Sequence, residues 1–291
     1  MGAKFGPAGN SESFQAMGYR KTIQVPEYII RMGLDAYEYQ CGRGVRISGE
    51  AARAFGEKAR EHQGILSLHS PYYISLSGIE EEKRLGSIEY ILQSARAADA
   101  MGAQRVVVHS GSCAKLSRQQ AMELAKDTLT RAYQRLDQEG LGHIRLCPET
   151  MGKLNQLGTL EEVLELCLLD ERLIPCIDFG HLNARTFGAL NSFEGIRQVF
   201  ETMENVLGLD RMRQFHAHFS KIEYTEKGGE KCHLTFADTV YGPQFEPVAE
   251  MIVRKNASPT IICESAGTQA EDAATMKRMY AQALAACGQA E

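Results

Sequence analysis

Histidine, aspartate and glutamate residues recur in this sequence directly after short apolar runs. The motifs that combine such a run with these side chains are LSLHSPYY (His69), VVVHSGS (His109), LCPET (Glu149), CIDFGH (Asp178, His181), HAHFSK (His216, His218) and IICES (Glu264), and His233 follows in a later segment. Imidazole nitrogens and carboxylate oxygens are typical ligands of catalytic zinc and manganese sites. The motifs therefore predict a catalytic metal site.

Each of these residues taken alone has an ordinary explanation. A histidine near a strand end is more often a hydrogen-bonded structural residue than a ligand, and Glu149 or Glu264 could cap loop amides. Carboxylates at the ends of buried apolar strands are costly, however, unless they are paired or bound to a cation. Several of them converging on one rim would repel one another, so we interpret the set as metal ligands. The remaining histidines, His62 and His143, are expected on the surface.

The elements that would position these residues are short apolar runs that alternate with helix-patterned stretches. Runs such as 106–108 and 260–263 show no polar alternation, which is typical of parallel strands buried on both faces. The predicted strands are Lys4–Pro7, Ala36–Gln40, Ile65–Ser70, Arg105–Ser110, Ile144–Glu149, Leu173–Asp178, Gln214–Phe219 and Thr260–Glu264.

Capping boxes indicate the starts of three intervening helices, and they pair Ser117 with Gln120, Thr159 with Glu162, and Asn191 with Glu194. Strand followed by helix, repeated without a Pro/Gly/Ser-rich linker, predicts an α/β fold: a (β/α)₈ TIM barrel with residues 1–291 as a single domain. The alternative is an open doubly wound sheet, but KFGPAGNSES after the first strand does not match the glycine-rich GxGxxG turn. Active sites of barrels lie at the C-terminal ends of the strands, which is where the motifs fall.

Composition narrows the functional classes. The 291 residues carry a net charge of −5, which argues mildly against nucleic acid as a partner, although bound cations would add positive charge locally. The 8 cysteines are scattered singly, so we expect reduced thiols packed as small hydrophobic residues. No apolar run is long enough to span a bilayer, and the N-terminus lacks a secretory signal. We therefore expect a cytoplasmic protein with no membrane partner, and a monomer.

From about Leu66 to Glu264, the strand-end motifs resemble the endonuclease IV family of apurinic/apyrimidinic endonucleases, which is part of the xylose isomerase-like TIM barrel superfamily. The resemblance implies a DNA-repair enzyme that hydrolyses the phosphodiester 5′ to abasic sites in DNA. It also implies two or three Zn²⁺ ions, with Mn²⁺ as an alternative in one or more sites, that activate water and stabilise charge on the phosphate.

Carried over residue by residue, the resemblance assigns ligands to three ions. The first ion would take His69, His109 and Glu149; the second would take Glu149 as a bridge with Asp178, His216 and Glu264; the third would take His181, His233 and an aspartate. The resemblance gives Glu149 and Glu264 the catalytic roles, with Glu264 orienting the nucleophile. DNA contacts would come from Arg43 and Arg46 in the loop CGRGVR and from Tyr72 and Tyr73 after His69.

The third ion is where this sequence departs from the family. Lys231 occupies the position of the family aspartate, two residues before His233. Glu230, His218 or Asp238 could replace it, or the third site could be weak or absent.

Two other functions are compatible with parts of the pattern. Xylose isomerase-like sugar isomerases and epimerases use one Mn²⁺-type ion, and Glu149, Asp178, His216 and Glu264 would satisfy that core. This alternative leaves His69, His109 and His233 unexplained. A binding barrel with a degenerate site is the third possibility. The number of bound metal ions separates the nuclease from the epimerase, because the nuclease requires two or more ions and the epimerase requires one.

Overall fold

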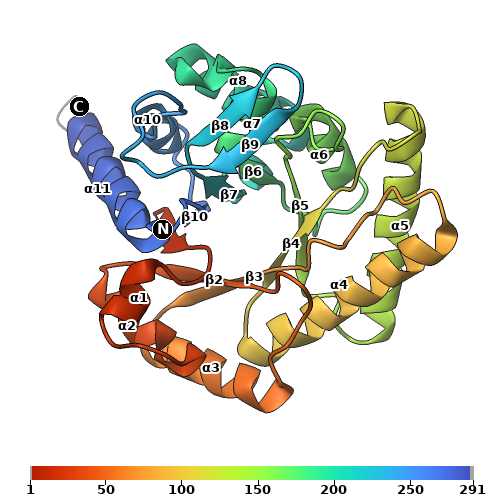
Figure 1. Cartoon of the computed structure of the whole chain (residues 1–291), viewed down its shortest axis with the longest axis horizontal. Helices are drawn as coiled ribbons and strands as arrows, with labels where there is room; N and C mark the ends of the chain where they lie inside the picture. Colours follow the sequence, from red (N-terminus) through yellow and green to blue (C-terminus); the bar gives the residue numbers. More distant parts are fainter. Residues whose placement is uncertain (1, 289–291) are drawn as a thin grey trace.

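The computed structural model describes residues 2–288, which form a barrel of eight parallel strands enclosed by helices (Figure 1). Neighbouring strands are hydrogen-bonded in the order β1-β10-β7-β6-β5-β4-β3-β2. A parallel bridge between Ala8 and Glu38 links the segment after β1 to β2 and closes the barrel. The predicted TIM barrel is confirmed.

The barrel strands lie within the predicted runs. Their bounds are β1 (Lys4–Pro7), β2 (Ala36–Gln40), β3 (Ile65–His69), β4 (Arg105–His109), β5 (Arg145–Glu149), β6 (Cys176–Asp178), β7 (His216–Phe219) and β10 (Thr260–Cys263). The largest difference is in β6, which has 3 residues instead of the whole predicted run Leu173–Asp178. Pro175 has no N–H to donate to a neighbouring strand, so the pairing starts after it.

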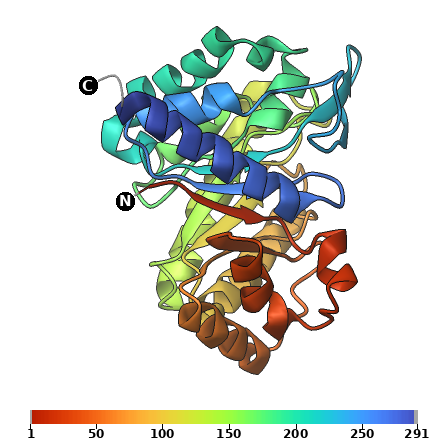
Figure 2. The same ribbon diagram turned by 90° about the vertical axis from the view of Figure 1, so that its left-hand side faces the viewer.

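Helices cover the outside of the barrel. Their bounds are α1 (Glu12–Ala16), α2 (Val25–Arg31), α3 (Gly49–Glu61), α4 (Glu81–Met101), α5 (Arg118–Gln138), α6 (Leu160–Cys167), α7 (Phe179–Arg185), α8 (Phe193–Leu207), α9 (Leu209–Met212), α10 (Glu246–Arg254) and α11 (Gln269–Gly288), with short 3₁₀ turns η1 (Thr22–Gln24) and η2 (Ala189–Asn191). The last helix, α11, runs alongside β1, so the C-terminal helix packs against the first strand (Figure 2).

Two of the three predicted capping boxes are confirmed, at Ser117 before α5 and at Thr159 before α6. The third was wrong by one residue. Asn191 is the last residue of η2, whereas Ser192 has the extended backbone that an N-cap requires and accepts a hydrogen bond from the Gly195 amide at 3.0 Å.

Close approach of β1 and β2 depends on Gly6. A Cβ atom at Gly6 would lie 1.9 Å from the backbone oxygen of Ala36, so no larger residue fits there. This contact lies where the first and last elements of the barrel meet, and it sets the position of β2 relative to the barrel interior.

An antiparallel hairpin that the sequence did not predict follows β7 and consists of β8 (Ile222–Thr225) and β9 (Gly229–His233). The pairing register changes between Glu223 and Tyr224 of β8: Glu223 pairs with Cys232, whereas Tyr224 pairs with Glu230. Lys231 is therefore the extra residue of a β-bulge. The hairpin brings His233 back towards α7.

The cysteines agree with the expectation from composition. All of them are free thiols, and most of them are buried, as the packing interpretation requires. Among residues 2–288, no helix combines the length and the apolar character needed to cross a membrane.

Candidate metal centre

The carboxylate of Glu149, at the end of β5, lies at the centre of a cluster of imidazole rings. Its side chain is almost completely buried. Glu149 Oε2 is 3.3 Å from Nε2 of His69 and 3.2 Å from Nε2 of His109, which end β3 and β4. Glu149 Oε1 is 2.9 Å from Nδ1 of His218 and 3.6 Å from Nδ1 of His181. The two oxygens of one carboxylate thus face two different sets of histidines.

A second group surrounds the other side of Glu149. Glu149, Asp178, His218 and Glu264 each place one ligand atom within 4.8 Å of the others. Asp178 Oδ1 accepts a hydrogen bond from the His181 amide at 2.7 Å. Asp178 Oδ2 is buried and has no hydrogen-bond partner among residues 2–288, although His181 Nδ1 lies 3.2 Å away. A buried carboxylate oxygen that lacks a donor suits a position facing a cation.

A third group consists of His181, Glu230 and His233, whose ligand atoms also lie within 4.8 Å of one another. The distance from His181 Nε2 to Glu230 Oε2 is 3.5 Å. The bulge explains why Glu230, and not Lys231, reaches this group. Lys231 Nζ and Cys232 Sγ both contact the Glu223 carboxylate, at 2.7 and 3.4 Å, so these consecutive residues share one face. Glu230 and His233 are left on the opposite face.

His218, and not the predicted His216, lies beside Glu149 and Asp178. Both side chains are fully buried and point into the barrel, because they are two residues apart on β7. The register pairs His218 with Asp178, whereas His216 pairs with Cys176, one layer deeper. His216 Nε2 donates to Glu38 Oε2 at 2.9 Å and is not a member of the groups around Glu149.

Neighbouring carbonyl groups determine which nitrogen two of the histidines direct at the centre. His69 Nδ1 donates to the Ser70 carbonyl at 2.9 Å, so Nε2 faces Glu149. His181 Nδ1 donates to the Thr150 carbonyl at 3.0 Å, so Nε2 faces Glu230. Acceptors that orient ligating imidazoles in this way are a usual feature of metal sites.

Charges in the cluster are strongly coupled. Burial lowers the pKa of His69, but Glu149 outweighs it and raises the pKa to about 9. Burial also lowers the pKa of His181, and Asp178 raises it to about 9. Burial raises the pKa of Asp178 to about 6, and the neighbouring carboxylate of Glu264 adds to the rise. The buried carboxylates thus favour the protonated form of the neighbouring imidazoles, and a bound divalent cation would supply the compensating positive charge instead.

The predicted DNA-contacting residues lie together on the surface. Tyr72 and Tyr73 are each about half exposed, with relative exposures of 49% and 48%, and their ring centroids are 4.5 Å apart. Arg43 and Arg46 are exposed on the loop after β2. The Tyr72 amide donates to the Gly42 carbonyl at 3.2 Å, which joins this loop to the loop that follows His69.

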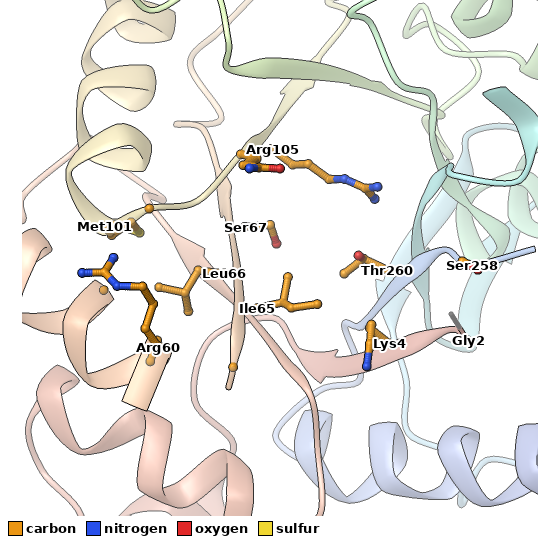
Figure 3. A pocket seen from close by; sticks show the side chains of 15 residues that line it. Gly2, Lys4, Arg60, Ile65, Leu66, Ser67, Met101, Arg105, Ser258 and Thr260 are labelled. Atoms are coloured by element: carbon orange, nitrogen blue, oxygen red, sulfur yellow. The ribbon is translucent and has the colours of Figure 1, made fainter. Parts of the chain in front are cut away.

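A cavity of about 440 Å³ lies at the opposite end of the barrel (Figure 3). It is lined by the first residues of several strands, among them Lys4, Ile65, Arg105 and Thr260. The Arg105 guanidinium is already engaged, because it donates to the Gln214 carbonyl at 3.0 Å. The ligand clusters, at the C-terminal strand ends, are separate from this cavity.

The profile of the xylose isomerase-like TIM barrel family matches residues 26–284. This chain belongs to that family. An uncharacterized family relative from Methanocaldococcus jannaschii is 34% identical over 235 residues, which cover 81% of this chain and 83% of the relative. A protein of Methanosphaera stadtmanae named probable endonuclease 4 is 26% identical over 161 residues. That match spans 54% of this chain and only 56% of the relative.

Solved structures of both enzyme types share the family fold. Endonuclease IV from Thermus thermophilus superposes with a TM-score of 0.67 at 20% identity, covering 97% of this chain and 98% of that chain. A D-tagatose 3-epimerase-like protein superposes with a TM-score of 0.69 at 21% identity, covering 90% and 93%. At these identities the likeness shows the fold alone. Hydrolase and isomerase chemistry are both represented among the neighbours.

Proposed function

We propose that this protein is a metal-dependent phosphodiesterase that hydrolyses DNA 5′ to abasic sites and acts as a monomer in DNA repair. The observation that carries the proposal is the position of His69 and His109 against the same oxygen of Glu149. A one-ion sugar epimerase has no use for these two imidazoles, whereas a centre of two or three Zn²⁺ ions, or Mn²⁺ ions, needs them.

The donor set supports such a centre. It contains only imidazole nitrogens and carboxylate oxygens, which suit Zn²⁺ and Mn²⁺, and Asp178 Oδ2 has no hydrogen-bond donor among the described residues. We assign His69, His109 and Glu149 to the first ion and Glu149, Asp178, His218 and Glu264 to the second. The third would take His181, Glu230 and His233. His218 replaces His216 in this assignment.

The proposed roles of the residues follow from their surroundings. Bound cations would lower the pKa of water and neutralise charge that develops on the phosphate. Glu149 is suited to bridging, because each of its oxygens faces a different set of histidines. Glu264 is only partly buried, so it can bind a cation and also orient the attacking water from the open side. These two carboxylates are the proposed catalytic residues.

DNA is the proposed partner, and the exposed patch of Arg43, Arg46, Tyr72 and Tyr73 is its proposed contact surface. Guanidinium groups can pair with phosphates, and tyrosine rings can stack against a base or fill the gap at an abasic site. Replacing Tyr72 with alanine should weaken binding about tenfold or more, because stacking contributes roughly 1–3 kcal/mol per base. The metal content of this variant should not change.

The test is cleavage of a duplex that contains one synthetic abasic site, with the undamaged duplex as the control. We expect cleavage of the abasic duplex only, its loss in EDTA, and its return with Zn²⁺ or Mn²⁺. The rate at low duplex concentration should fall steeply with salt, because phosphate contacts release counterions. Absence of cleavage with every added ion would reject the nuclease function.

A sugar epimerase is the second candidate, because Glu149, Asp178, His218 and Glu264 form a complete one-ion group without His69 and His109. The two glutamates could then exchange a proton with a carbon next to a carbonyl. Incubating the Mn²⁺-loaded protein with ketohexoses in D₂O separates the two functions. Incorporation of deuterium into the sugar would favour the epimerase, and the nuclease proposal predicts none.

A further inference from the structure

A buried carboxylate, Glu38, lies in the barrel interior beneath the candidate metal centre. Glu38 is fully buried in the middle of β2, and it plays no part in the roles proposed above. Glu38 Oε2 accepts hydrogen bonds from Ser67 Oγ at 2.9 Å and from His216 Nε2 at 2.9 Å, and Oε1 accepts one from Gln40 Nε2 at 3.1 Å. Oε1 also lies 2.9 Å from Nε2 of His218.

The groups around Glu38 suit an ionised carboxylate, because a hydroxyl, an amide and an imidazole each donate a hydrogen bond to it. An uncompensated buried charge would cost several kcal/mol. The barrel interior therefore contains a fixed negative charge that touches one proposed metal ligand directly.

His218 lies between two carboxylates. Its Nδ1 atom is 2.9 Å from Glu149 Oε1 and 3.5 Å from Glu264 Oε1, on the side of the proposed second ion. Its Nε2 atom, on the other side, is buried and has no hydrogen-bond partner among residues 2–288, although Glu38 Oε1 is 2.9 Å away. If Nδ1 binds a cation, the single remaining ring proton must be on Nε2, and Glu38 is the acceptor beside it.

This arrangement completes a pattern that two other proposed ligands already show. The backbone carbonyl of Ser70 accepts a hydrogen bond from Nδ1 of His69, and that of Thr150 accepts one from Nδ1 of His181. Glu38 would serve His218 in the same way, with the difference that this acceptor carries a full charge. Carboxylates in this position orient the ring and raise the basicity of the ligating nitrogen, and their loss typically lowers metal affinity 10- to 100-fold.

We propose that Glu38 is a positioning residue that holds His218 in the Nε2-protonated tautomer, so that Nδ1 binds the cation between Glu149 and Glu264. This inference rests on the metal centre of the proposed function, and it does not depend on whether the substrate is DNA or a sugar. His216 is a second donor that keeps Glu38 in place from below, and it does not ligate an ion.

The variant Glu38→Gln tests this role, because it removes the charge and preserves the volume. Ser67→Ala is the matched control: it removes one hydrogen bond to the same carboxylate and leaves the charge and the His218 contact intact. Zn²⁺ affinity is measured by competition with a chromogenic chelator. We expect Glu38→Gln to lower the Zn²⁺ affinity of the site that contains His218 by about 10- to 100-fold. The Zn²⁺ affinity of Ser67→Ala should stay close to that of the wild type. Equal affinities for wild type and Glu38→Gln would overturn the proposal.

A second measurement uses only the wild-type chain, in case Glu38→Gln does not fold. In Zn²⁺-loaded protein labelled with ¹⁵N-histidine, the ring ¹⁵N chemical shifts and ¹H–¹⁵N correlations identify the protonated nitrogen of each ring. We expect His218, assigned through His218→Gln, to carry its proton on Nε2. A proton on Nδ1, with Nε2 bound to the ion, would contradict the proposal.

Two further results would distinguish the proposed role of Glu38 from a deeper metal site and from the nuclease function. Loss of a Zn²⁺ equivalent in Cys176→Ser would place an ion at the deeper group of Cys176, His216 and His218, and would overturn the hydrogen-bonding role of Glu38. If Glu38→Gln weakens Zn²⁺ binding but the wild type cleaves no abasic duplex, the nuclease function fails and the role of Glu38 stands.

Discussion

Glu149 Oε1 lies 2.9 Å from Nδ1 of His218, although the two residues are separated by 69 positions in the chain. Parallel strands bring them together, because β5 and β7 both pair with β6 and end at the same rim of the barrel. Around this pair the chain gathers the side chains of Asp178 and Glu264, whose ligand atoms lie within 4.8 Å of those of Glu149 and His218. Such a set of imidazole nitrogens and carboxylate oxygens is suited to binding divalent cations.

Replacing Glu264 with glutamine should abolish cleavage of an abasic duplex and leave the fold intact. The change removes one anionic ligand from a partly buried site with almost no change in volume. The expected loss of rate is at least about 100-fold, comparable to that of other groups that stabilise charge in a transition state. Circular dichroism checks the fold, and Glu57→Gln on the exposed face of α3 is the matched control. Undiminished cleavage by Glu264→Gln would remove this residue from the catalytic roles.

The two histidines of β7 should respond differently to substitution. His218→Gln should lose at least one ion, because Nδ1 of His218 belongs to the group around Glu149. His216→Gln should keep its ions, since an amide can still donate to Glu38 from the deeper layer. Elemental analysis of both purified variants provides the measurement. The reverse result would restore His216 as the ligand that the sequence first suggested.

Glu230 and Lys231 form a matched pair of neighbouring residues on β9. Glu230→Gln should release the third ion selectively, because Glu230 Oε2 faces His181 at 3.5 Å. Lys231→Gln should retain this ion, since Lys231 points to Glu223 on the other face of the bulge. Metal content and residual cleavage are measured for both variants. If only Lys231→Gln loses an ion, the bulge does not direct Glu230 to the site.

The stability of the metal-free protein should fall between about pH 6.5 and 9. The pKa values of His69 and His181 rise from 6.5 to about 9 in the fold. A raised histidine pKa contributes stability in full below the unfolded value, and that contribution is lost as the pH rises through the folded value. Zn²⁺-loaded protein should not show this loss, because ligating imidazoles are already neutral.

Thermal unfolding followed by circular dichroism, with EDTA or with Zn²⁺, checks the pH dependence. The melting temperature in EDTA should decrease across this range, while the melting temperature in Zn²⁺ should stay level or increase. A melting temperature in EDTA that rises with pH would mean that the buried imidazoles do not carry protons in the metal-free fold.

The barrel, and the gathering of histidines and carboxylates at one rim of it, could be predicted because strand ends are visible in the sequence. Uninterrupted apolar runs such as Val106–Val108 identify buried parallel strands, and the polar residue that ends each run must lie at the catalytic rim. The sequence shows less clearly how deep in the barrel a residue of a given strand lies. His216 and His218 share a face, and only the register with β6 reveals that His218 is the one level with Asp178.

Two features of the site had no clear signal in the sequence. The run AYEYQ of β2 has the alternation of a half-buried strand, in which a central glutamate would normally face solvent. In the barrel the same alternation turns Tyr37 and Tyr39 towards Phe55 of α3 and directs Glu38 inwards. The bulge at Lys231 depends on hairpin pairing, so spacing alone could not show that Glu230, and not Lys231, lies beside His181 and His233.

The metal content of protein purified without a chelator tests the central claim most directly. The two proposed ion sites that share Glu149, together with the group of His181, Glu230 and His233, predict two or more equivalents of Zn or Mn per chain, as in sites where neighbouring ions act on one phosphate. A value near one equivalent, unchanged in His69→Gln, would contradict the shared centre and leave the single-ion epimerase core as the better account.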